Sequence, residues 1–417
     1  MKIFDKSNGS QRGCNMKKRF FRFAILPLLA GILVGCAELN IGTALRNDPA
    51  APGPVKIGVI APLSGGNRFY GERMLDGVQL AVEELNNGRG INGRKVELLV
   101  RDSRSEPERA AELVRDLNDA GIVGLIAGYS SDEVLAIAPE ARRHSLPTLV
   151  PLATSSEIFA GNPFLFRNTF TGREEAKALA GYAWYWRKLL RIAVLTDAGP
   201  RGGYSREIGR EAVRSFTALG GTVVRAAEIQ TDDPGLEAVL RDVLAAAPQG
   251  ILIPFETSEA ALLVRQLREM GYQGLLFGGD SWDENRFLRT CGAQPGDCAY
   301  IAFYSPESDS PENRLFRDSF RRTFYRYPGS CEAQGYDAVK LLAIGLSGTR
   351  TLEEFTTNLL AVRNQPMAAG LITILPEGKL DRTVYINTIR PAGRNNPEPT
   401  GRTSKTFLLS KLDQFVN

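Results

Sequence analysis

Residues 55–66 read VKIGVIAPLSGG, and two later segments, 122–131 and 147–156, read IVGLIAGYSS and PTLVPLATSS. Each is a short apolar run that ends in glycine, serine or threonine, which is typical of a buried strand followed by a polar turn. Apolar residues at helical spacing over 74–85 and 110–117 lie between the first two segments. Strands and helices that alternate at this length predict a parallel α/β sheet, whose strand carboxyl ends form a crevice for a small polar molecule.

The same pattern restarts in the second half of the chain. A strand-like RIAVLTD at 191–197 leads into the glycine-rich AGPRGGYS at 198–205, and QGILIPF (249–255) and GLLFGGD (274–280) are further buried strands separated by helical patterns. We therefore predict an α/β protein with two doubly wound parallel-sheet lobes. A hairpin-like segment follows at 371–389.

The N-terminal region predicts export rather than folding. Met16 starts a basic MKKRF segment, an apolar stretch follows, and LVGC at 33–36 resembles the lipobox of bacterial lipoproteins, in which the cysteine is lipidated. The apolar stretch is short and contains Arg22 and Pro27, so it does not fit a permanent membrane helix. We expect residues 1–35 to be a lipoprotein signal peptide, Cys36 to carry lipid and 36–54 to be a tether. The alternatives are an ordinary cleaved signal and a buried segment.

The charge of the chain changes once this leader is set aside. Residues 1–35 hold seven of the 51 Lys and Arg residues and one of the 47 Asp and Glu residues, so the +4 of the whole chain becomes −2 for the remainder. A basic surface for nucleic acid is therefore not supported, and no nucleic-acid partner is expected.

The cysteines predict either a disulfide or buried thiols. Cys291 and Cys298 flank a GAQPGD turn in a chain expected to be exported, where oxidation is permitted. A Cys291–Cys298 bridge is one reading, while Cys331 could be the rival partner or a free thiol. A zinc site is not expected, because the chain has no Cys-x-x-Cys pair and a single histidine, His144.

The usual signatures of catalysis are missing from the sequence. No G-x-S-x-G is present, Gly65-Gly66 is not followed by the Gly-Lys-Ser/Thr of a P-loop, and AGPRGGYS lacks G-x-G-x-x-G. We expect no catalytic residue, no metal and no cofactor. An enzyme of Rossmann-like fold is therefore disfavoured against a protein that binds without chemistry.

The whole pattern resembles the type I periplasmic binding proteins, and within them the branched-chain amino-acid binding proteins of ABC transporters. The stretches that carry the resemblance are KIGVIAPLSG, GVQLAVEELN, GINGRKVELLVRDS, GYSSDEVLAIAP and PLATSS, and it extends over about 55–390. It implies two lobes that close about a hinge of three crossovers, which we place near Thr171, Phe303 and Met367. The expected boundaries are 55–170 with 304–367 for lobe 1, 171–303 with 368–390 for lobe 2, and 391–417 for a C-terminal tail.

The resemblance also implies which residues hold the ligand carboxylate. Ser131 and Thr154 match the family's hydroxyl residues, and Ser130 and Ala153 would supply adjacent backbone. Hydroxyls and N–H groups at a helix N-terminus suit a carboxylate without needing a cation. Ser130 and Ser131 also fit a helix N-cap, because Asp132 and Glu133 follow.

Four further positions match the family's remaining ligand contacts. Tyr204 and either Glu259 or Asp280 would meet the amino group from lobe 2, and Tyr70 would cover the ligand from lobe 1. Thr171-Gly172 replaces the family's usual Ser-Asp-like pair, and no cysteine precedes Ser131, so the identity of the ligand stays open. A solvated helix-start glutamate is the alternative interpretation of Glu259.

These observations predict a membrane-tethered solute receptor of an ABC importer. The expected ligand is an amino acid, branched-chain or related, or a similar small carboxylate, and the expected partners are the permease subunits of the transporter and the membrane. The protein would lie in the cell envelope, facing the periplasm or the extracytoplasmic side. The alternative is a non-transport lipoprotein that uses the same fold to sense a ligand or to regulate a cell-envelope partner.

Overall fold

A computed structural model gives the fold of the chain. It describes residues 45, 47–49, 51–159, 161–200, 202–283, 285–292, 295–376, 379–390 and 400–411. Cys36 and the expected signal peptide lie outside these residues. Among the helices that are described, none is long and apolar enough to cross a bilayer.

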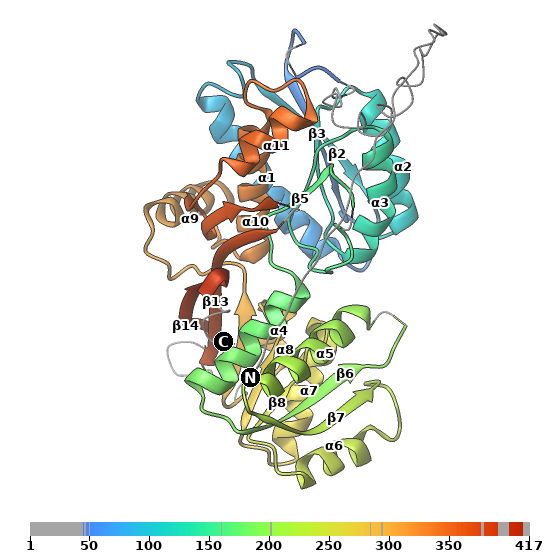
Figure 1. The fold of residues 1–417 in the computed structure, drawn as a ribbon, viewed down its shortest axis with the longest axis vertical. Coiled ribbons are helices and arrows are strands. Elements are labelled where there is room, and N and C mark those ends of the chain that lie inside the picture. The colour runs from blue at the N-terminus through green and yellow to red at the C-terminus, as the bar shows by residue number, and fades with distance from the viewer. Residues whose placement is uncertain are drawn as a thin grey trace, which may run out of the picture. The chain divides into compact units, whose positions relative to one another are not determined.

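The first sheet is parallel and carries the stretch that opens the folded chain. Its strands are β1 (Val55–Ala61), β2 (Val96–Asp102), β3 (Gly124–Ala127), β4 (Thr148–Val150) and β5 (Leu165–Arg167). They lie in the order β2-β1-β3-β4-β5, in which the chain winds outward from β1 in both directions. Figure 1 shows β2, β3 and β5 of this sheet beside α2 and α3. The predicted doubly wound sheet is confirmed here, and the carboxyl ends of all five strands share one edge.

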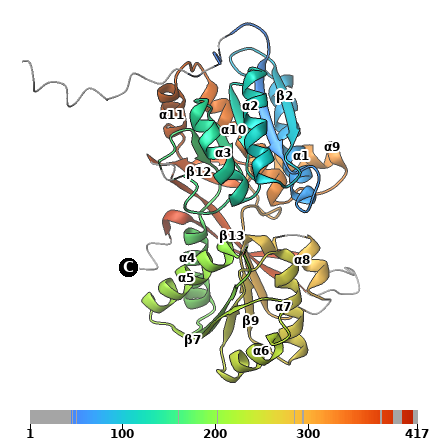
Figure 2. The ribbon, with the colours of Figure 1, turned by 90° about the vertical axis from the view of Figure 1, so that its right-hand side faces the viewer.

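Helices cover both faces of this sheet because its strands are apolar on both sides. The helices are α1 (Arg68–Asn87), α2 (Pro107–Asp119), α3 (Ser131–Arg143), α9 (Pro311–Phe324), α10 (Ser330–Leu346) and α11 (Leu352–Leu360). Helices α1 and α10 pack together on the side of Ile57 and Val59, and α2 and α3 pack together on the side of Ile60 (Figure 2).

The second sheet is mixed. Its parallel part comprises β6 (Arg191–Asp197), β7 (Thr222–Ile229), β8 (Gly250–Leu252), β9 (Leu275–Gly278) and β10 (Cys298–Ala302). Antiparallel strands continue it: β11 (Gln365–Met367), β12 (Gly370–Ile374), β13 (Leu380–Arg390) and β14 (Thr400–Leu408). The predicted hairpin is the β12–β13 pair, whereas residues 400–408, expected to be part of a tail, form a strand on β13.

Helices again cover both faces of the second sheet. They are α4 (Gly172–Gly181), which runs on as a π-helical turn over Tyr182–Trp186, α5 (Gly203–Ala218), α6 (Leu236–Ala245), α7 (Thr257–Glu269) and α8 (Asn285–Thr290). Helix α4 packs against α5, and α7 packs against α8. A 3-10 turn, η2 (Asp280–Trp282), follows β9 directly, and its Trp282 is fully buried.

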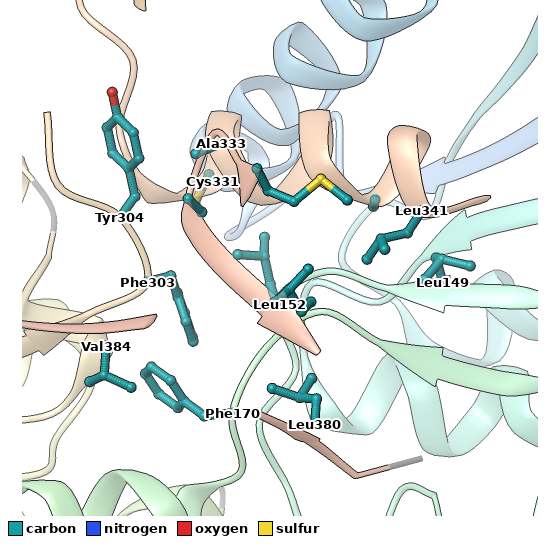
Figure 3. Packing of buried hydrophobic residues seen from close by; sticks show 14 of the residues in the cluster. Leu149, Leu152, Phe170, Phe303, Tyr304, Cys331, Ala333, Leu341, Leu380 and Val384 are labelled. Carbon is teal, nitrogen blue, oxygen red and sulfur yellow. The ribbon is translucent and has the colours of Figure 1, made fainter. Parts of the chain in front are cut away.

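The segments that pass between the two sheets meet at a buried arginine. Arg382 in β13 donates to the carbonyl of Asn168 after β5, to the carbonyl of Phe303 after β10 (2.7 Å) and to Oε1 of Gln334 (2.9 Å). Figure 3 shows Phe170 and Phe303 packed together beside Val384, with the two ring centroids 4.4 Å apart. The crossing segments are therefore joined by hydrogen bonds and by apolar packing.

Candidate functional site

A cavity of about 830 Å³ lies at the carboxyl ends of the strands of both sheets. That volume is within the usual range for a small-molecule site. Seven of the eight residues that we expected to contact a ligand line it: Tyr70, Ser130, Ser131, Ala153, Thr154, Tyr204 and Asp280. The structure thus gathers residues that are up to 210 positions apart in the sequence.

The lobe 1 wall presents hydroxyl and backbone donors. Ser130 is the N-cap of α3, and its Oγ accepts from the N–H of Glu133 (3.3 Å), so the capping interpretation of this residue is correct. Ser131 begins the helix, and its Oγ accepts from the N–H of Ser155 (3.3 Å), which leaves its own hydrogen for another acceptor. Thr154 is 5% exposed and follows β4. A helix N-terminus flanked by hydroxyls is suited to an anion.

Two stacked tyrosines form another part of the lobe 1 wall. The rings of Tyr70 and Tyr129 lie 4.7 Å apart at 19°. The hydroxyl of Tyr70 is 2.8 Å from Oγ1 of Thr257 at the start of α7, and Thr257 in turn donates to the carbonyl of Ser281 (2.8 Å). This chain of hydroxyls connects the first sheet's helices to the second sheet's strand ends across the cavity.

The lobe 2 wall presents Tyr204 and the carboxyl group of Asp280, and the carboxyl group of Glu175 lies behind them. The hydroxyl of Tyr204, on the first turn of α5, lies 2.8 Å from Oδ1 of Asp280 and 3.1 Å from Oε1 of Glu175. The N–H of Asp280 donates to the same Oε1 of Glu175 (2.9 Å). Burial raises the pKa of Asp280 to about 6 and raises that of Glu175 well above its ordinary value. These carboxyl groups lack a protein cation within hydrogen-bond distance in the described residues.

A second acid of this wall was not expected from the sequence. Asp283 follows the 3-10 turn η2, three residues after Asp280, and residues at that spacing in a 3-10 turn share one face. Its Oδ2 accepts from the hydroxyl of Ser330 at the start of α10. Burial, with the charge of Asp280 adding to it, raises the pKa of Asp283 to about 8.

The sequence also missed Glu175, Thr257 and Ser330. Glu175 and Ser330 do not follow a strand, so the strand-end pattern that identified Thr154 and Asp280 gave no signal for them. Thr257 does follow the predicted strand at 249–255, so the same pattern was a usable signal for it. The repeated acid in Asp280-Ser281-Trp282-Asp283 was a usable signal for Asp283, because it places two carboxyl groups beside one turn.

Glu259 is a correction, since the structure does not place it among the lining residues of the cavity. Glu256 and Thr257, at the start of α7, line the cavity instead. Successive helical residues turn by about 100°, so Glu259 lies about 200° round the helix from Thr257 and points elsewhere. Asp280 is therefore the acid of the expected pair that reaches the cavity.

The expected disulfide is a second correction. Cys291 and Cys298 are both free thiols in the structure. The Cys291 thiol donates a hydrogen bond to the carbonyl of Leu288 (3.3 Å), and the Cys298 thiol donates one to the carbonyl of Pro295 (3.2 Å). Cys298 is fixed in register opposite Leu276 in the parallel sheet. Burial raises the pKa of the Cys291 thiol to about 11 and that of the Cys298 thiol to about 12. Cys331 is buried at the start of α10 and lines the cavity.

The side of α5 that lines the cavity adds charges of both signs to it. Arg206, Arg210 and Arg214 recur at four-residue spacing, with Glu207 and Glu211 between them. Arg206 donates to the carbonyls of Asp197 and Gly199, and Arg214 pairs with Glu211. Across the described residues, no group of three or more His, Cys, Asp or Glu side chains has a geometry that could hold a metal ion.

Comparison with known proteins identifies the family of the chain. A family model described as "Periplasmic binding protein" matches residues 54–394. The chain belongs to the type I periplasmic binding proteins. Both the resemblance predicted from the sequence and the predicted fold class are therefore confirmed.

Individual relatives of this periplasmic binding protein are distant but match most of its length. The Leu/Ile/Val-binding protein BraC3 of Rhizobium johnstonii is 23% identical over 342 residues, which are 81% of this chain and 92% of that protein. The isoleucine complex of LivJ, a branched-chain amino acid transporter substrate binding protein of Streptococcus pneumoniae, has a TM-score of 0.75 at 24% identity, over 85% of this chain and 99% of that one.

A third relative of this periplasmic binding protein carries a different ligand. It is a solute binding protein of an ABC transporter from Rhodopseudomonas palustris BisB5, in complex with 3,4-dihydroxy benzoic acid. Its TM-score is 0.71 at 21% identity, over 85% of this chain and 97% of that one. Proteins of this fold thus take both amino acids and carboxylates that lack an amine.

Proposed function

We propose that the protein is the extracytoplasmic solute-binding component of an ABC importer and that it binds an α-amino acid in the cavity between its lobes. The observation that carries the proposal is the pairing of opposite chemistries across one cavity. Hydroxyl and N–H donors at the start of α3 face the cavity from lobe 1, and the Asp280 carboxyl faces it from lobe 2. An α-amino acid carries the complement of both, a carboxylate and an ammonium.

The carboxylate end of the ligand would be held by Ser131 and Thr154. The Oγ of Ser131 accepts a hydrogen bond from the N–H of Ser155. Its own hydroxyl hydrogen is not part of that bond and can be donated to a carboxylate oxygen of the ligand. The N-terminus of α3 favours negative charge at this place. Ser130 and Ala153, which also line the cavity, would supply backbone beside it.

The amino end would be held by Asp280 and Tyr204, and Tyr70 would cover the ligand. A buried carboxyl group with no protein cation beside it costs free energy to ionise, and a cation bound next to it offsets that cost. A ligand ammonium would be that cation. No catalytic step is needed for this function, and we propose binding without chemistry, cofactor or metal.

We also propose that the protein is anchored to the membrane by lipid on Cys36, with the folded lobes in the cell envelope outside the cytoplasm, where they would meet the permease subunits. The LVGC motif after the basic MKKRF segment supports this proposal. The Cys36→Ala variant should remain unprocessed and carry no lipid in the cells that produce it. Metabolic labelling with a fatty acid is the measurement, and equal labelling of the variant would contradict the anchor.

A thermal-shift screen of the purified protein tests the ligand class. A ligand that binds the folded state raises the melting temperature by mass action. The proposal expects the largest shifts from α-amino acids in a panel that also contains small carboxylates, sugars and nucleosides. Protection by sugars or nucleosides, with none by amino acids or carboxylates, would contradict it.

A further inference from the structure

Glu175 lies directly behind the wall of the cavity, and the ligand-contact positions implied by the family resemblance did not include it. It is in the first turn of α4, one residue after Glu174, which closes the capping box with Thr171. Glu174 therefore satisfies the helix end, and Glu175 points inward instead, where it is 0% exposed. A fully buried acid that caps no helix needs another explanation.

The hydrogen count around Glu175 supplies that explanation. The Tyr204 hydroxyl carries a single hydrogen, yet it has an oxygen of Asp280 at 2.8 Å and an oxygen of Glu175 at 3.1 Å. The N–H of Asp280 satisfies Glu175 Oε1 only in part (2.9 Å), and Glu175 Oε2 is buried without a hydrogen-bond partner in the described structure. With both acids ionised, this group of oxygens is short of one hydrogen.

The local backbone is built to bring these oxygens together. A Cβ atom at Gly279 would lie 2.1 Å from the Tyr204 hydroxyl and 2.4 Å from Glu175 Oε1, so only glycine permits the approach. Trp282, whose indole N–H donates to the carbonyl of Ile253 (3.2 Å), fixes the turn that carries Asp280. The arrangement is a constructed feature of the fold and not a chance contact of surface acids.

We propose that Glu175 is a proton-carrying positioning residue, which holds Tyr204 and Asp280 in place and keeps the negative charge of the pair on Asp280, so that the cavity selects ligands with a protonated amine. This inference rests on the proposed function and names the group that makes its amine subsite. Glu175 itself is not among the lining residues and acts through the two that are.

The surroundings of the pair agree with one shared proton. Three titratable groups lie near the pair: Tyr204 from α5, which bonds to both acids, Glu256 from the loop before α7, whose charge acts on Tyr204, and Asp283 after η2, on which the charge of Asp280 acts. All of these are acids. Burial raises the pKa of both carboxyl groups. The charge of Asp280 raises the pKa of Glu175 further, while the hydrogen bond from Tyr204 lowers that of Asp280. The proton therefore rests on Glu175 and the charge on Asp280 near neutral pH.

Selection for an amine then has a definite pH signature. An ammonium ligand needs ionised Asp280, whose pKa is about 6. Its affinity should fall by roughly tenfold per pH unit below that value. A carboxylate of the same shape without the amine gains nothing from the ionised acid, so its affinity should not rise between pH 5 and pH 7.

L-leucine and 4-methylpentanoate are the matched probes, because they differ only in the amino group. Calorimetry of the full protein between pH 5 and pH 8 should show the leucine affinity rising to a plateau and the 4-methylpentanoate affinity level or falling. Glu175→Gln keeps the size and the hydrogen-bond donor, so it should keep both the plateau and the midpoint. Glu175→Met removes the donor. It should move the midpoint of the leucine affinity–pH curve to higher pH and weaken leucine binding at pH 7 by more than tenfold.

The outcomes separate this inference from the proposed function. An unchanged midpoint in Glu175→Met, or a tenfold loss at pH 7 in Glu175→Gln, would overturn the role of Glu175 even if leucine binds. If Glu175→Met does not fold, the Glu175→Gln profile still decides. If leucine binds with no pH dependence while Thr154→Ala weakens it, the proposed function stands and this inference is wrong. If neither probe binds at millimolar concentration, the titrations are repeated with the amino acid of the largest thermal shift and its deaminated analogue, and if no α-amino acid binds, both fail.

Discussion

At the scale of single residues, the sequence was most informative where a functional residue directly follows a strand. Thr154 and Asp280 were identifiable because a short apolar run ends just before each of them, and the structure places both at the cavity. Glu175 and Ser330 could not be found in this way. Their positions depend on how one helix packs against another segment far away in sequence, and a local pattern carries no information about that.

Asp283 gives a residue-scale prediction on stability. An acid whose pKa is raised from 3.8 to about 8 holds more protons in the folded than in the unfolded protein between those two values. The free energy of unfolding therefore falls as pH rises through that window. Asp283→Asn mimics the protonated acid, so it should stabilise the ligand-free protein at pH 8 by on the order of 2 kcal/mol and have little effect at pH 4.

Urea unfolding at the two pH values measures this difference. Asp232→Asn is the control, because Asp232 is exposed in a loop and is not a lining residue of the cavity. Equal stability of Asp283→Asn and the wild-type protein at pH 8 would show that Asp283 ionises there without cost.

At the scale of elements, the sequence predicted the positions of strands better than the direction of helical side chains. The strand-and-turn pattern over 55–156 is strong because buried parallel strands are continuous apolar runs bounded by turn residues. Glu259 was misplaced because its neighbours in sequence do not show which side of α7 faces the cavity. The antiparallel strand β14 was missed because residues 391–404 are rich in Pro, Gly and Asn, which normally mark loops.

The turn after β9 gives an element-scale prediction. Gly279 has an extended backbone that alanine can adopt, so the effect of Gly279→Ala comes from its Cβ, which would displace Tyr204 and Glu175. We expect L-leucine affinity to fall by at least about tenfold, which is the effect of losing one hydrogen bond to a charged group.

Gly181→Ala is the matched control for this substitution, because a Cβ at Gly181 would meet no atom within 4 Å. Calorimetry of both variants is the measurement, with circular dichroism to confirm the fold. An unchanged affinity in Gly279→Ala would mean that the close approach of these oxygens does not matter for binding.

At the scale of the whole molecule, two hydrogen bonds between side chains of the described residues connect the lobes beside the cavity. One joins the Tyr70 hydroxyl to Thr257, and the other joins Ser330 to Asp283. Both pairs line the cavity, so they favour the arrangement in which a ligand would be enclosed. Closure of two lobes around a ligand is a hinge motion, and its equilibrium is set by such contacts together with those of the ligand.

Tyr70→Phe tests this molecule-scale interpretation. The substitution keeps the ring stacked on Tyr129 and removes only the hydroxyl that reaches Thr257. A lost neutral hydrogen bond is worth about 1 kcal/mol, so we expect roughly fivefold faster dissociation of the ligand. Stopped-flow fluorescence measures the rate, and Tyr325→Phe is the control because Tyr325 is 92% exposed. Dissociation at the wild-type rate in Tyr70→Phe would show that this contact does not hold the lobes together.

The most direct test of the central claim, an α-amino acid held between the hydroxyls of lobe 1 and the acid of lobe 2, is a calorimetric titration. It uses the amino acid with the largest thermal shift and compares wild-type protein with Thr154→Ala, Asp280→Asn and the exposed control Thr217→Ala. We predict that Thr154→Ala and Asp280→Asn each weaken binding by roughly ten- to a hundredfold, the effect of losing a hydrogen bond to a charged group, and that Thr217→Ala binds as the wild-type protein does. Wild-type affinity in both Thr154→Ala and Asp280→Asn would contradict it.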